Sequence, residues 1–187
     1  MRTLKTLILA AAITTGGLIC TGTAHAQTTF RELAKQGEAK KALALVDEGN
    51  EHKAFGEYTE ALGKYEEALT IDANCAPAYV GVAWVRNEQK EYGKAKDAAN
   101  AAIKADAKCG AAYRELGFAE WHQGETKAAK EALEAAVGCD GTDLPAYAYL
   151  IDLLEETGEK KAAGEYKKHR DAEVERQANP EQKKTIY

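Results

Sequence analysis

The residues of this sequence with the greatest capacity for chemistry are four cysteines and four histidines. No two cysteines form a CxxC or CxxCH motif, which argues against haem attachment, thioredoxin-like redox chemistry and a structural zinc site. His52, His122 and His169 share no metal-ligand spacing. A nucleophilic pairing of Cys75 with His122 lacks a nucleophile elbow or any other supporting motif. We therefore expect a protein that is not an enzyme and carries no metal or cofactor.

Composition narrows the class of partner. The formal net charge is −5, and 45% of residues are apolar, which is ordinary for a globular protein. No run rich in lysine and arginine offsets the acidic balance, so we do not expect nucleic acid as a partner.

Residues 1–26 have the three parts of a bacterial secretory signal peptide. MRTLK supplies the positive start, TLILAAAITTGGLIC is the apolar segment, and Ala24-His25-Ala26 is a small-x-small cleavage signature. The apolar run is short for a membrane anchor. We expect cleavage after Ala26, no membrane insertion afterwards, and a periplasmic or secreted protein.

The rest of the chain repeats itself every 34 residues. APAYVGVAWVRNEQKEYGKAKDAANAAIKADAKC, residues 76–109, aligns without a gap on residues 110–143, and the same frame extends to neighbouring units on both sides. One column holds Gly49, Ala83 and Gly117. Small residues recur in two further columns: Ala61, Ala95, Ala129 and Ala163, then Ala68, Ala102 and Ala136. Such residues allow two helix backbones to approach closely, and a single helix pair cannot bury its apolar face alone.

An aromatic column, Tyr79, Tyr113 and Tyr147, accompanies these columns of small residues. A 34-residue period with this pattern resembles the tetratricopeptide repeat (TPR) family. The resemblance implies an all-α fold, a right-handed superhelical stack of about four helix-turn-helix units, or α-solenoid. We assign residues 27–41 to a short lead-in, 42–177 to the repeat domain and 178–187 to a flexible tail. The units are 42–75, 76–109, 110–143 and 144–177. The expected helices are 38–54, 57–71, 76–89, 91–105, 110–123, 125–138, 144–157 and 159–177.

The resemblance also implies a concave groove, lined by the first helix of each unit, that holds a protein or peptide partner. Carried over position by position, the groove residues are Asn50, Lys53, Val80, Trp84, Asn87, Arg114, Phe118, Trp121, His122, Ala148, Asp152 and Glu155. Large aromatic residues are typical anchors for such partners. The alternative is that Trp84 and Trp121 complete the core. The family's carboxylate clamp is not reproduced apart from Asn50, so we do not expect chaperone-tail binding.

Two functions remain open at this stage: a periplasmic scaffold that binds a partner segment, and a self-associating structural module of a cell-envelope complex. The cysteines leave alternatives as well. Antiparallel pairing in the third unit brings Cys109 near Cys139, so these two are a disulfide candidate. The alternative is that all three cysteines are reduced and buried. If a disulfide does form, Cys75 is left free, or it bridges to Cys109 in place of Cys139.

Overall fold

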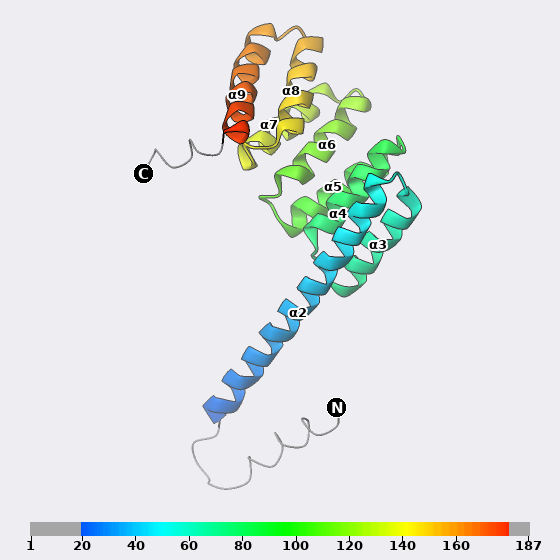
Figure 1. Ribbon diagram of the computed structural model, residues 1–187, viewed down its shortest axis with the longest axis vertical. Coiled ribbons are helices and arrows are strands. Elements are labelled where there is room, and N and C mark those ends of the chain that lie inside the picture. Colours follow the sequence, from blue (N-terminus) through cyan, green and yellow to red (C-terminus); the bar gives the residue numbers. More distant parts are fainter. Residues whose placement is uncertain (1–19, 180–187) are drawn as a thin grey trace. The chain divides into compact units, whose positions relative to one another are not determined.

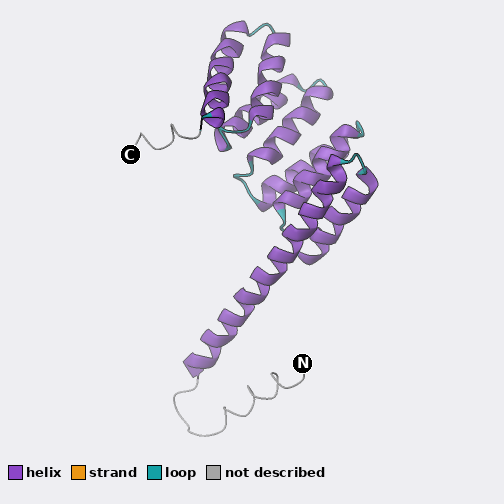
Figure 2. Ribbon diagram, viewed as in Figure 1, coloured by secondary structure: helices purple, strands orange, loops and turns teal. Residues whose placement is uncertain are grey.

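The computed structural model describes residues 20–179 of the chain, with side chains from residue 32. This part is all-helical and contains no strand (Figure 2). The hairpins lie within residues 39–179. The helices are α2 Cys20–Ala54, α3 Tyr58–Ile71, α4 Ala76–Glu88, α5 Tyr92–Ala105, α6 Gly110–His122, α7 Thr126–Cys139, α8 Leu144–Glu156 and α9 Lys160–Ala178.

Helices α3 to α9 begin and end within one residue of the expected positions, so the predicted α-solenoid is confirmed. Successive helices pair and stack in chain order (Figure 1). The expected start of this helix at residue 38 was wrong, because α2 already includes residues 20–37. No proline interrupts residues 20–54, so no residue in this stretch forces the helix to end. Residues 1–19 and 180–187 lie outside the described part.

Each hairpin turns through one residue in the left-handed backbone region. These residues are spaced 34 apart: Gly56, Lys90, Gly124 and Gly158, with φ between 60° and 81°. Glycine adopts this conformation without steric cost, and Lys90 is the one copy that accepts the strain. The repeat is therefore visible in the turns as well as in the helices.

Small residues in the repeat leave space for a large side chain on the neighbouring helix. Tyr65 of α3 is fully buried between Gly49 of α2 and Gly81 of α4. A Cβ atom added at Gly49 would lie 2.6 Å from the Tyr65 ring, and one added at Gly81 would lie 2.4 Å from it. These contacts leave no room for a side chain at either glycine.

The facing residues of the hairpins complement one another in size. Where the second helix carries Leu133, the first helix carries Gly117, and an added Cβ there would lie 2.7 Å from Leu133 Cγ. In the second hairpin the pair is Ala83 with Ala99, both fully buried in one small cluster. Glycine thus faces leucine in one hairpin and alanine faces alanine in the other, which keeps both interiors densely packed.

Ion pairs join the second helix of one hairpin to the turn of the next hairpin. Lys96 Nζ lies 2.6 Å from Glu125 Oε2, and Lys130 Nζ lies 2.6 Å from Glu159 Oε2. Within the described residues, no helix has the length and apolarity that a membrane span requires.

Candidate partner-binding face

The first helices of the four hairpins, α2, α4, α6 and α8, form what we call the first-helix face. Helix α4 contacts α6, and α6 contacts α8. Lys53 connects α2 to this row, since its ammonium lies 5.0 Å from the centre of the Trp84 ring of α4. The face therefore carries side chains from every hairpin.

A buried polar network lies at the middle of this face. Arg114 donates from Nε and Nη2 to Glu115 Oε1 at 3.1 and 3.0 Å, and from Nη1 to Asp143 Oδ2 at 2.6 Å. Asp143 also caps α8, because its Oδ1 accepts the Ala146 N–H at 3.0 Å. Arg114 thus ties α6 to the start of α8.

The other end of the network reaches α4. Asn87 Nδ2 donates to Glu115 Oε2 at 3.0 Å and to the Glu115 carbonyl oxygen at 3.1 Å. Asn87 Oδ1 is buried without a hydrogen-bond partner. Burial raises the pKa of Glu115, and the nearby Arg114 guanidinium opposes that rise. Burial also lowers the pKa of Lys53, against the attraction of Glu115.

An aromatic cluster lies beside this network on α6 and α8. The Phe118 ring centre is 4.2 Å from that of His122 and 4.9 Å from that of Tyr149. His122 also lies 5.1 Å from Tyr92 and 5.7 Å from Trp121, measured between ring centres. Phe118, Trp121 and Tyr149 are half-buried and His122 is exposed, so the cluster offers apolar ring surface to solvent.

The two tryptophans combine both roles considered from the sequence. Trp84 is half-buried against the core cluster around Tyr65, and Trp121 is half-buried against the core cluster around Leu150. Each also has a polar contact: Lys53 lies over Trp84, and Trp121 Nε1 donates to Glu156 Oε2 at 2.8 Å. They are partly core residues that keep an exposed edge.

The remaining predicted groove residues are placed less uniformly. Asn50 Oδ1 accepts the Tyr65 hydroxyl at 2.9 Å, so this residue supports the core. Val80 and Ala148 are half-buried. Asp152 and Glu155 are exposed, and Glu155 pairs with Lys167 of α9.

Three important residues were missed from the sequence: Asp143, which neutralises Arg114, and Tyr92 and Tyr149, which complete the aromatic cluster. The buried Glu115 was missed as well. Its column holds Gly81 in the preceding unit, and the Cβ position of Gly81 faces the buried Tyr65 ring. The signal available in the sequence was a charged residue at the position where the preceding unit carries Gly81.

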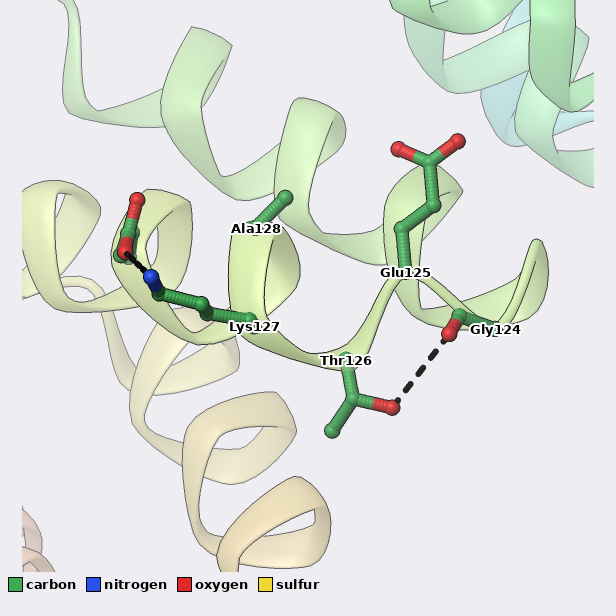
Figure 3. A pocket seen from close by; sticks show the side chains of 6 residues that line it. Gly124, Glu125, Thr126, Lys127 and Ala128 are labelled. Carbon is green, nitrogen blue, oxygen red and sulfur yellow. Dashed lines mark hydrogen bonds and ion pairs between the residues drawn. The ribbon is translucent and has the colours of Figure 1, made fainter.

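A shallow hollow of about 570 Å³ lies at the turn between α6 and α7 (Figure 3). It is lined by Gly124, Glu125, Thr126, Lys127, Ala128 and Glu131. An equivalent hollow, shifted by one repeat, is lined by Gly158, Glu159, Lys160, Lys161, Ala162 and Glu165. Because it recurs with the period, this hollow follows from the hairpin turn, and we assign it no ligand.

Within the described residues, no group of three or more histidine, cysteine or acidic side chains is placed to hold a metal ion. Cys75 is buried in the core, and burial raises the pKa of its thiol, the opposite of what a nucleophilic thiolate needs. Cys75, Cys109 and Cys139 are free thiols. The predicted disulfide is therefore not present in this structure.

The architecture is that of an α-solenoid built from stacked helical hairpins. Comparison with family models finds no match, and comparison with curated proteins finds none either. Among solved structures, the chain is similar to a crystal structure of MamA, with 24% identity, 73% of this chain and 80% of that chain covered, and a TM-score of 0.62.

Two further solved structures are similar to this chain, and both are TPR proteins. The Sgt2 TPR domain from Aspergillus fumigatus is 26% identical over 65% of this chain and 82% of its own, with a TM-score of 0.59. YrrB, described as a TPR protein with an unusual peptide-binding site, is 25% identical over 71% of this chain and 68% of its own, with a TM-score of 0.57. The chain therefore has the tetratricopeptide-repeat fold, and the resemblance predicted from the sequence is confirmed.

Proposed function

We propose that this protein is an exported, non-catalytic scaffold that binds an extended segment or a helix of a partner protein across the first-helix face. The solvent-exposed ring surface of Phe118, Trp121, His122 and Tyr149 is the observation that carries the proposal. Half-buried rings on a rigid helical support are suited to anchoring a polypeptide, since they contribute contact area with little loss of side-chain freedom.

The polar network supports the same proposal. Arg114, Glu115 and Asp143 hold α6 and α8 in fixed register below the rings, so the ring surface is organised before any partner arrives. The peptide-binding site named for YrrB is consistent with this use of the fold. The buried Cys75 thiol favours a role without catalysis.

Selection of a displayed peptide library on the purified chain tests the binding proposal. The chain contains two tryptophans, both on the first-helix face, so their fluorescence reports binding there. For a selected peptide, we expect Phe118→Ala to raise Kd about tenfold or more, because it removes an anchor ring from the centre of the cluster. Titration followed by tryptophan fluorescence measures this change.

Val174→Ala is the matched control, since Val174 is an exposed apolar residue on α9, outside the first-helix face. This variant should bind with unchanged Kd, and urea unfolding verifies that both variants are folded. Selected peptides that bind the Phe118 variant as tightly as the unmodified chain would refute the site.

Self-association is the competing function, and sedimentation separates the two. A monomer at all protein concentrations, with peptide bound one to one, supports the scaffold. Concentration-dependent assembly that is abolished by the selected peptide would instead assign this face to contacts between copies.

Export is supported by the sequence of residues 1–26 alone. Expression of the whole chain in a Gram-negative bacterium, followed by cell fractionation and mass measurement, tests it. We expect a periplasmic product that begins at Gln27. A cytoplasmic product that retains the first 26 residues would contradict export and leave the binding proposal untouched.

A further inference from the structure

The two ends of the third hairpin meet beside a pair of cysteines. Cys109 directly precedes α6, and Cys139 is the last residue of α7. A Cβ atom added at Gly110 would lie 3.2 Å from Asp140 Cβ and 3.4 Å from Asp140 N. The backbone beside Cys109 therefore lies close to the backbone beside Cys139.

The two thiols differ in accessibility. Cys139 is exposed and Cys109 is half-buried, and both are free. Burial raises the pKa of the Cys109 thiol, and a charge on Cys139 is among the weaker effects that raise it further. An oxidant from solution meets Cys139 first.

The backbone around Cys139 can adjust. Gly138 and Gly141 flank it, whereas the two preceding units carry Thr70 with Ala73 and Lys104 with Ala107 at these positions. A Cβ added at Gly138 would meet no atom within 4 Å. Glycine in a helix stabilises it less than other residues do, so the last turn of α7 can shift at low cost. A disulfide requires the two Cα atoms to be about 4.4–6.8 Å apart.

We propose that Cys109 and Cys139 form an oxidisable pair that a small disulfide, such as glutathione disulfide, converts into a cross-link across the third hairpin. The Cys139 thiolate attacks one sulfur of the oxidant, forms a mixed disulfide and releases one glutathione. The Cys109 thiolate then attacks Cys139 Sγ and releases the second glutathione. Two protein thiols are oxidised, and one glutathione disulfide is reduced to two thiols.

Cys75 provides an internal comparison. It precedes α4 as Cys109 precedes α6, but the residue in its hairpin that corresponds to Cys139 is Ala105. Cys75 is also buried. The same oxidant should leave it as a thiol.

The experiment treats the whole chain with glutathione disulfide, alkylates the remaining thiols and digests with trypsin. We expect residues 109–114 joined to residues 131–160, and Cys75 recovered in alkylated form. The cross-link closes a loop of about 30 residues, so Tm should rise by about 5 to 10 °C over the reduced protein. Cys75→Ala should keep this rise, and Cys139→Ser should lose it.

Digestion of the unmodified chain decides the question even if a variant folds poorly. A reaction that stops with glutathione on Cys139 would show that the two sulfur atoms cannot meet. A cross-link from Cys109 to Cys20 or Cys75, or no reaction at either thiol, would equally overturn the pairing. None of these results bears on partner binding.

Discussion

Arg114→Met is expected to lower the free energy of unfolding by about 3–5 kcal/mol, because it leaves two buried carboxylates without their cation. The side chains of Glu115 and Asp143 are 4% and 6% exposed, and Arg114 is the residue that pairs with both. Methionine keeps most of the packing volume of arginine. The lost stability therefore measures the effect of the missing charge and not that of a cavity. Urea unfolding at pH 7 measures it.

The loss should depend on pH in a defined direction. Burial already raises the pKa of Glu115, and removal of the guanidinium takes away the main opposing influence. A carboxyl group with a raised pKa binds protons more readily in the folded than in the unfolded state, so its burial costs least in acid and most above its folded pKa. The deficit of the variant should therefore shrink as pH falls from 7 towards about 5, in paired unfolding curves.

Arg170→Met is the matched control. Arg170 also pairs with the acidic residue that follows it, Asp171, but its side chain is 34% exposed and that of Asp171 is 65% exposed. An exposed pair of this kind contributes about 0–1 kcal/mol. If the two variants lose equal stability, or if the deficit at Arg114 grows in acid, the buried network is not what holds α6 to α8.

Adding Glu115→Gln and Asp143→Asn to the Arg114 variant removes the uncompensated charge. Asparagine at position 143 can still cap α8, since it retains a side-chain oxygen. We expect this triple variant to recover much of the lost stability and to lose the pH dependence.

The sequence predicted the hairpins well because the repeat samples each structural position several times. Gly49, Ala83 and Gly117 share one column, and a column of small residues has few explanations other than close helix packing. Residues 20–37 occur once, outside the repeat, so the pattern gave no information about where α2 begins.

The first-helix face was predicted less completely because its network joins different columns of successive units. Arg114 meets Asp143 29 residues later, and Lys96 meets Glu125 at the same separation. A comparison within columns cannot reveal such contacts, since they depend on how one hairpin rotates against the next. The two tryptophans could not be assigned from the sequence either to the core or to the first-helix face. Each packs against a core cluster and is also partly exposed on that face.

The close approach of α3 to its neighbours yields the second large expected effect. Gly81→Val should destabilise the protein by about 3 kcal/mol, because the new side chain overlaps the Tyr65 ring. An added Cβ alone would lie 2.4 Å from Tyr65 Cζ. The ring cannot yield cheaply, since Gly49 contacts it on α2 and its hydroxyl is bonded to Asn50. Urea unfolding measures the loss.

Gly63→Val separates overlap from any general effect of valine in a helix. Gly63 lies within α3, and an added Cβ there would meet no atom within 4 Å. Valine is no worse than glycine in a helix, so this control should be neutral or slightly stabilising. Tyr65→Leu removes the ring that the new side chain in Gly81→Val overlaps. The double variant should therefore be more stable, by about 1 kcal/mol or more, than the sum of the two single losses predicts. If the effects of the two changes are strictly additive, the glycine at position 81 is not required by the size of the Tyr65 ring.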